Sequence, residues 1–174
     1  MKKTIAVIVG TRPEAIKLAP VIRALGFSDH LQPVTISTSQ HGEMVEQIFE
    51  NFGITADVDL QVMRPRQKLW DLTAILSTEL GAYFSNHPVD AVLVQGDTTS
   101  ALIGGLSAFY HKIPVGHVEA GLRSHDRYSP FPEELNRTLL SRIAQWHFAP
   151  TAHAADLLRS ENIDNASIYI TGNT

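Results

Sequence analysis

The 174-residue sequence contains no cysteine. A disulfide framework, an iron–sulfur cluster, a thiolate zinc site and a cysteine nucleophile are therefore excluded. The sequence also lacks any apolar run near the roughly 20 residues that a membrane-spanning helix requires. The apolar stretch at residues 5–9 follows two lysines but is too short for the core of a signal peptide. We therefore expect no membrane partner and a cytoplasmic location.

A strong excess of one charge is missing as well. Lys and Arg number 14 against 18 Asp and Glu, which gives a net charge of −4 and a pI near 6.0. This balance argues against nucleic acid as a partner. The chain is 44% hydrophobic and 18% charged, which is too apolar for a disordered protein. Its length predicts one domain over residues 1–174, or two very small ones, and folding is expected to bury about 70% of the unfolded surface.

Short apolar runs alternate with amphipathic stretches along the chain. The run at residues 4–9 is typical of a strand buried on both faces, and residues 13–25 place Ala15, Leu18 and Ile22 on one helical stripe. Six such strands separated by helices predict an α/β fold with a Rossmann-like, doubly wound parallel sheet. The predicted strands are residues 4–9, 33–38, 91–94, 113–118, 146–149 and 167–170, and the predicted helices are 13–25, 41–52, 68–84, 98–110, 133–145 and 151–159.

Two segments interrupt this pattern. Pro20 removes the hydrogen bond to the carbonyl of Ile16, which predicts a kink or a restart in the first helix. Residues 53–66 show no clear period, so we predict a long loop there.

In a doubly wound sheet, ligands bind beyond the carboxyl ends of the strands. The first such junction runs from Gly10 to Glu14, with Lys17 one turn later. Backbone N–H groups at the helix start, together with Arg12 and Lys17, could bind an anionic group. The spacing is neither the dinucleotide pattern G-x-G-x-x-G nor a P-loop, so we predict no nicotinamide cofactor. The alternative is a tight turn in which Glu14 and Lys17 form a surface pair.

Two further junctions carry carboxylates. Asp97 follows the strand at 91–94, where it could also cap the next helix. Glu119 follows the strand at 113–118, where a parallel strand leaves the core. Because glutamate is seldom buried unless paired, either Arg123 neutralises Glu119 or its pKa has a function.

A proline-bounded segment introduces the helix at 133–145. Glu133 and Glu134 stand at its start, where acidic residues also favour a helix electrostatically. With Asp97 and Glu119, they place carboxylates at one edge of the sheet and form a candidate acid/base cluster.

The remaining polar residues support fewer activities. None of the 8 histidines forms an H-x-H or H-E-x-x-H pair, so we predict no metal site. His117 and His125 lie close to the carboxylates in sequence and are candidates for substrate binding. Ser129 lacks the G-x-S-x-G context of a serine hydrolase.

Six motifs, in order and at matching spacing, closely resemble the bacterial non-hydrolysing UDP-N-acetylglucosamine 2-epimerases. The likeness runs from the first strand to the last residue. The motifs are GTRPEAIK at 10–17, QH at 40–41, GDT at 96–98, GHVEAGLR at 116–123, SPFPEELNR at 129–137 and TGNT at 171–174.

The resemblance implies a two-domain, glycosyltransferase-B-like architecture in which residues 1–174 form the amino-terminal domain and the carboxy-terminal domain is absent from this chain. It implies interconversion of UDP-N-acetylglucosamine and UDP-N-acetylmannosamine without a cofactor or metal. That reaction eliminates UDP to give 2-acetamidoglucal and then adds UDP back. A homodimer is expected. The alternatives are a hydrolysing epimerase, another glycosyltransferase-B enzyme, or a non-catalytic sugar-nucleotide-binding domain.

The resemblance also implies roles for individual positions. Gly42 and Glu43 differ from the family's commoner basic and amide residues after Gln40. The implied catalytic carboxylates are Asp97, Glu119 and Glu133; the expected substrate contacts are Arg12, Lys17, His117 and Arg123; and the implied allosteric positions are Gln40, Arg66 and Glu133.

Overall fold

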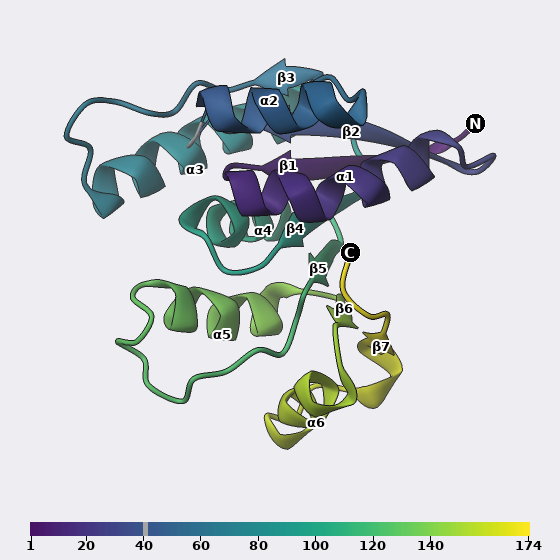
Figure 1. Ribbon diagram of the computed structural model, residues 1–174, viewed down its shortest axis with the longest axis vertical. Coiled ribbons are helices and arrows are strands. Elements are labelled where there is room, and N and C mark those ends of the chain that lie inside the picture. Colours follow the sequence, from purple (N-terminus) through teal and green to yellow (C-terminus); the bar gives the residue numbers. More distant parts are fainter. Residues whose placement is uncertain (40–41) are drawn as a thin grey trace.

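Strands and helices alternate along the chain in a computed structural model, which describes residues 1–39 and 42–174 (Figure 1). Within these residues, no helix combines the length and the apolar character needed to cross a bilayer. The strands are β1 (Lys3–Val9), β2 (Leu31–Ser37), β3 (Val58–Asp59), β4 (Ala91–Gln95), β5 (Val115–Val118), β6 (Trp146–Ala149) and β7 (Ile168–Ile170). The helices are α1 (Arg12–Gly26), α2 (Gly42–Phe52), α3 (Leu69–Asn86), α4 (Thr99–Tyr110), α5 (Glu133–Ile143), α6 (Ala152–Ser160) and the 3₁₀ turn η1 (Asn165–Ser167).

The strands form one parallel sheet in the order β3-β2-β1-β4-β5-β6-β7. In Figure 1 this order runs from β3 at the top to β7 at the bottom. The strand order reverses between β1 and β4, which is the switch point where doubly wound sheets open a crevice for ligands. The predicted Rossmann-like parallel sheet is confirmed.

The strand β3 lies within the segment predicted as a loop. Its two residues pair with Ile36 and Ser37 of β2. The preceding Asp57 accepts a hydrogen bond from the backbone N–H of Thr35 at 2.7 Å. The loop prediction is wrong at this point because a two-residue edge strand is too short to produce a hydrophobic period.

The first helix is continuous through Pro20, so the predicted restart is wrong. Pro20 is exposed and Ile16 is 40% exposed, which places the interrupted turn on the solvent side. Solvent-side carbonyls of a helix can turn to water, and this compensates for the hydrogen bond that proline removes.

Helices cover both faces of the sheet. On one face, α1 and α2 bury side chains such as Leu18 and Phe49 against β1. On the other face, α3, α4 and α5 bury side chains such as Leu76, Ile103 and Leu140 against β1, β4 and β5. Burial on both faces explains why the central strands are continuous apolar runs.

The fourth helix approaches the sheet closely, as its small residues predict. A Cβ atom on Gly104 would lie 2.5 Å from Ile8 Cδ1, and one on Gly105 would lie 2.8 Å from Leu140 Cδ2. Glycine at both positions therefore lets α4 pack between β1 and α5, and this fixes the start of α4 beside Asp97.

A substitution of Gly121 can measure how closely the segment after β5 packs against α6. It has a φ of +93°, and a Cβ atom would lie 2.3 Å from the carbonyl oxygen of Ala154 in α6. Gly53 has a φ of +63° but an open environment, so it serves as a matched control. We predict that Gly53→Ala costs about 1–2 kcal/mol of backbone strain. Gly121→Ala adds a steric cost of about 1–3 kcal/mol, measurable by urea unfolding. Equal losses in the two variants would contradict this packing.

Candidate active site

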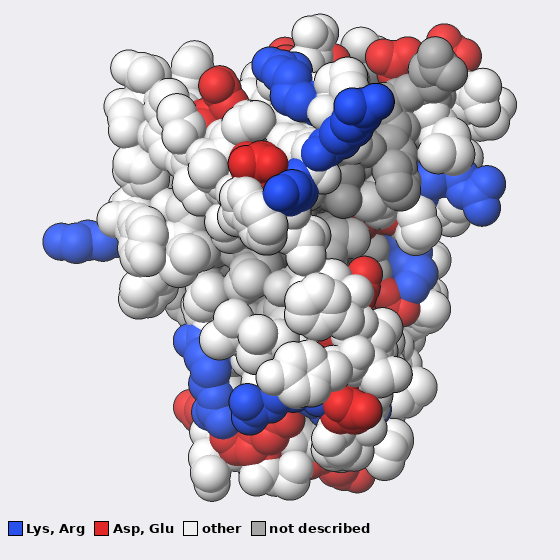
Figure 2. Space-filling model, turned by 90° about the vertical axis from the view of Figure 1, so that its left-hand side faces the viewer, with Lys and Arg blue, Asp and Glu red and all other residues white. Residues whose placement is uncertain are grey.

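The carboxyl ends of the parallel strands meet at one end of the molecule. In Figure 1 this end lies on the left, and Figure 2 looks onto it, with acidic and basic side chains interspersed across the surface. Asp97 follows β4, Glu119 follows β5 and Glu133 begins α5. Glu133, Glu119 and Lys17 are all close enough to Asp97 to influence its pKa electrostatically. The structure therefore brings the three predicted carboxylates and Lys17 together.

Glu119 is paired with Lys17 rather than with Arg123. The Lys17 ammonium forms an ion pair with Glu119 Oε1, and the side-chain amide of Gln95 donates to Glu119 Oε2. The side chains of Lys17 and Glu119 are 26% and 13% exposed. The contact joins α1 to the end of β5 across the switch point. Of the two alternatives given for Glu119, neutralisation by Arg123 is wrong.

Asp97 is available for chemistry because another residue caps the helix that follows. Thr98 is the N-cap of α4, and its hydroxyl accepts a hydrogen bond from the N–H of Ala101 at 3.0 Å. Asp97 Oδ2 lies 3.1 Å from the guanidinium of Arg137 on α5. Burial raises the pKa of Asp97 above its ordinary value; Arg137 opposes this rise, and the charges of Glu133 and Glu119 add to it.

Glu133 is half-buried, and its carboxylate makes no hydrogen bond or ion pair with the described part of the chain. Its backbone carbonyl accepts from Arg137 Nε at 3.4 Å. Its neighbour Glu134 is 4% exposed and accepts hydrogen bonds from the backbone N–H groups of Ser124 and His125, both at 3.0 Å. Glu134 also lies 3.3 Å from Arg137 Nε. The two adjacent carboxylates thus differ: Glu134 anchors the loop, while Glu133 remains unpaired.

At the start of α1, the backbone N–H groups bind the carboxylate of Glu14. Glu14 is 2% exposed, and its Oε2 accepts from the backbone N–H groups of Gly10 at 2.7 Å and Thr11 at 2.6 Å. Its Oε1 accepts from the Thr98 hydroxyl at 2.5 Å. The alternative considered for this junction, a surface pair of Glu14 and Lys17, is therefore wrong. These two N–H groups are occupied, so an anion here would depend on the side chains of Arg12 and Lys17.

Two arginines predicted to bind ligands are exposed on the surface. Arg12 is exposed at the start of α1, and Arg66 is exposed with a φ of 59° in the loop before α3. Neither side chain forms a hydrogen bond or ion pair with a described residue. Gln40 lies outside the described residues.

Arg123 points into the protein rather than toward a ligand. Its side chain is 2% exposed and forms a bidentate pair with Glu161, at 2.6 Å and 2.7 Å. It also donates to Ser141 Oγ at 2.8 Å. Because these contacts occupy the guanidinium, its predicted role as a substrate contact is not supported. Arg123 instead joins the segment after β5 to α5 and to the end of α6.

His117 is also interior, which contradicts a direct substrate contact. It is 0% exposed, and its Nε2–H donates to the carbonyl of Gly96 at 2.7 Å. Burial lowers the pKa of His117 to about 4. His125, by contrast, is exposed in the loop before α5. Among the described residues, no group of three or more His, Asp and Glu side chains could hold a metal ion.

The sequence interpretation missed Gln95, Arg137 and Asn136. Gln95 is the polar last residue of an otherwise apolar strand, and Arg137 follows Glu134 at the i,i+3 spacing of a helical ion pair. Asn136 is 6% exposed and donates to the backbone carbonyl of Asp97 at 2.8 Å. The helical spacing could have identified Arg137, but no sequence pattern identifies the contact of Asn136.

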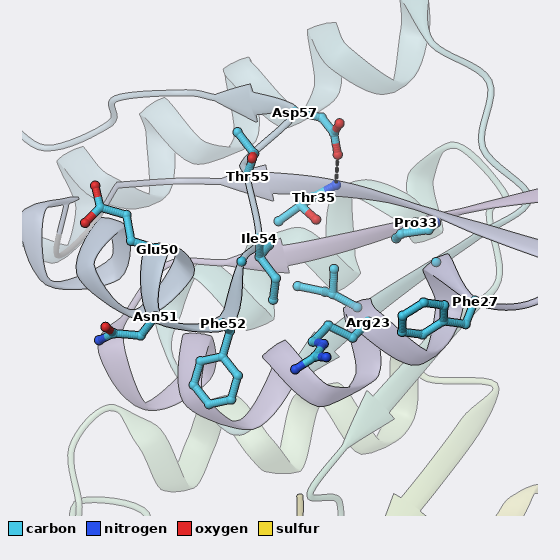
Figure 3. A pocket seen from close by; sticks show the side chains of 13 residues that line it. Arg23, Phe27, Pro33, Thr35, Glu50, Asn51, Phe52, Ile54, Thr55 and Asp57 are labelled. Atoms are coloured by element: carbon cyan, nitrogen blue, oxygen red, sulfur yellow. Dashed lines mark hydrogen bonds between the residues drawn. The ribbon is translucent and has the colours of Figure 1, made fainter.

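An open cavity of about 850 Å³ is lined by residues of α1, β2 and α2 and of the segment before β3 (Figure 3). Its lining includes Phe27 and Phe52, which adjoin the carboxyl ends of α1 and α2, and Asp57 before β3. None of the predicted site residues lines it. The carboxylates therefore define a separate site.

A family model described as UDP-N-acetylglucosamine 2-epimerase matches residues 23–174. The chain belongs to the UDP-N-acetylglucosamine 2-epimerase family. The UDP-N-acetylglucosamine 2-epimerase of Bacillus subtilis is 47% identical over 175 residues, an alignment that covers 100% of this chain and 46% of that relative. The chain spans about half the length of the curated relatives that it matches.

Solved structures of family members have the same fold. The UDP-N-acetylglucosamine 2-epimerase of Neisseria meningitidis, bound to UDP-GlcNAc, has a TM-score of 0.95 and 47% identity, and the match covers 99% of this chain and 46% of that one. MurG of Acinetobacter baumannii is 17% identical with a TM-score of 0.64, and the match covers 100% of this chain and 46% of that one. This last likeness shows the fold alone.

The buried His117 predicts how the stability of this epimerase-family chain depends on pH. The unfolded state binds a proton on His117 below pH 6.5, whereas the folded state resists protonation until about pH 4. The free energy of unfolding is therefore at its full value above pH 6.5 and falls as the pH decreases toward 4. By linkage, His117 costs about 3 kcal/mol of stability over that interval. Urea unfolding of the wild type and His117→Gln should show this difference at pH 4.5 relative to pH 7. Parallel pH profiles would contradict it.

Proposed function

We propose that this chain is the amino-terminal half of an enzyme that interconverts UDP-N-acetylglucosamine and UDP-N-acetylmannosamine. The observation that carries the proposal is the convergence of Asp97, Glu119 and Glu133 at the switch point. Family membership and the related Neisseria structure bound to UDP-GlcNAc support the choice of substrate. A second domain, outside this chain, would complete the nucleotide site.

The reaction that we propose needs acid/base groups on both faces of the sugar ring. A carboxylate takes the proton from C2, the C2–H electrons form the C1=C2 bond of 2-acetamidoglucal, and the C1–O bond breaks with loss of UDP. In the return step, a carboxyl group gives a proton to the opposite face of C2 while the UDP oxygen bonds to C1. Burial and the charges of Glu133 and Glu119 raise the pKa of Asp97, and a carboxyl group with a raised pKa is suited to hold such a proton.

Lys17 and Arg12 provide the positive charge that a diphosphate needs. Lys17 is partly exposed beside Glu119, and Arg12 is exposed one turn earlier on α1. Because Glu14 occupies the amides of Gly10 and Thr11, we propose that the UDP phosphates contact these two side chains rather than the end of the helix.

Several family properties remain predictions for this chain. They are a regulatory contact through Gln40, Arg66 and Glu133, a homodimer and a cytoplasmic location. Arg66 is exposed and could contact a second ligand molecule, while Glu133 lies in the carboxylate cluster.

Product analysis tests the proposed reaction. The full-length protein, incubated with UDP-N-acetylglucosamine and followed by NMR, should give UDP-N-acetylmannosamine and reach an equilibrium with both UDP-sugars present. Release of free N-acetylmannosamine and UDP would instead identify a hydrolysing epimerase. Binding of the substrate without turnover would favour a sensor.

The carboxylates should each be required for turnover. In the full-length protein, Asp97→Asn, Glu119→Gln and Glu133→Gln should each lower kcat by about 10²-fold or more, because each removes an acid/base group. Glu79→Gln, which alters an exposed carboxylate on α3, serves as the control for charge removal away from the cluster. Turnover at the control level in all three variants would remove this cluster from the mechanism.

A further inference from the structure

The turn that carries Asp97 is held by a side chain from the next strand. His117 lies on β5, in register with Val94 on β4. Its Nε2–H donates to the carbonyl oxygen of Gly96, directly before Asp97, at 2.7 Å. Because a carbonyl oxygen can only accept, Nε2 carries a proton. Burial lowers the pKa of His117 to about 4, so near neutral pH the ring is in its neutral Nε2–H form.

Hydrogen bonds from two neighbouring elements hold the backbone at this turn. Gly96 has a φ of +70°, and its N–H donates to the carbonyl of Val118 at 3.0 Å. One residue later, the carbonyl of Asp97 accepts from Asn136 at 2.8 Å. The two consecutive carbonyls thus bind side chains from β5 and α5, which fixes the direction of the Asp97 side chain between them.

The second ring nitrogen of His117, Nδ1, makes no hydrogen bond with the described part of the chain that would explain a histidine at this position. His117 Nδ1 is buried and has no hydrogen-bond partner among the described residues. Burying a polar atom without a partner is unfavourable, and an apolar residue would avoid it at this interior strand position. The contact with Gly96 is the one hydrogen bond that the ring makes with the described chain.

We propose that His117 is a positioning residue, which holds the Gly96 carbonyl so that Asp97 faces the reacting sugar. This inference rests on the proposed function, in which Asp97 is an acid/base group. His117 does not touch substrate, because it is completely buried. It acts through the turn, beside the Arg137 that pairs with Asp97.

Because only Nε2 of the His117 ring is hydrogen-bonded to a described residue, amide substitutions can separate the roles of the two ring nitrogens. The amide nitrogen of glutamine lies near the position of Nε2, whereas that of asparagine lies near Nδ1, so His117→Gln can keep the bond to Gly96 and His117→Asn cannot. His147→Asn is the matched control. His147 lies beside His117 on β6, is 2% exposed, and its Nε2 bonds to the carbonyl of Ser141 rather than to Gly96.

The first readout is amide hydrogen exchange in residues 1–174. The reporters are the N–H of Gly96, bonded to Val118, and the N–H of Ala101, bonded to the Thr98 hydroxyl. We expect His117→Asn to speed their exchange at least about tenfold relative to the amides of β1, as local opening of one turn does. His117→Gln and His147→Asn should leave this ratio near the wild-type value.

The second readout is turnover of the full-length protein. Misplacing a reacting group by about 1 Å can lower the rate about 10²-fold, so His117→Asn should lower kcat by about 10- to 100-fold with little change in KM. His117→Gln should restore most of the loss. If His117→Asn does not fold, the ring ¹⁵N shifts of the wild type decide, because protonation on Nδ1 would overturn the assignment.

Several results would overturn the proposal. It fails if His117→Gln is as impaired as His117→Asn, if His147→Asn has the same local effect, or if the Gly96 amide is unaffected. Failure of the proposed function would look different. In that case Asp97→Asn would retain full turnover, while the exchange pattern would still show whether His117 holds the turn.

Discussion

Two ion pairs make it possible to gather carboxylates at the edge of this sheet. Lys17 on α1 pairs with Glu119 after β5, and Arg137 on α5 pairs with Asp97 after β4. Without these cations, partly buried negative charges would repel one another in a medium that screens them poorly. Because each pair joins elements far apart in sequence, the site depends on the order β1-β4-β5 and on the helices that pack on both faces.

A second group of polar residues lies beneath the charged edge and takes no direct part in it. Glu14 bonds to the backbone of the first junction and to Thr98 of the second, while His117 bonds to Gly96. Glu14 links the first two junctions, and His117 links β5 to the turn after β4. Both are almost fully buried, so their role is to fix the shape of the site. The alternative of a surface Glu14 and the expectation of a substrate-binding His117 both placed on the surface side chains that are buried.

The sequence predicted most of the fold because the signals are local. Apolar runs and helical stripes identified six of the seven strands and the parallel sheet, and the junction rule located Asp97 and Glu119. The errors arise where tertiary structure decides. Pro20 sits on the solvent side of α1, β3 depends on the edge of β2, and Arg123 pairs with Glu161, 38 residues later. No local pattern reveals such partners, since they depend on how distant elements meet.

The central claim is that carboxylates from separate elements act on one another as a single electrostatic unit. The most direct test is a ¹³C NMR titration of the Asp97 carboxyl group in the wild-type chain and in Glu133→Gln. Glu133 makes no bond that this substitution would break. The account predicts a wild-type Asp97 pKa above its ordinary value, because burial and the nearby charges raise it, and a lower pKa in the variant. An ordinary pKa that is identical in the two proteins would show that the carboxylates do not converge.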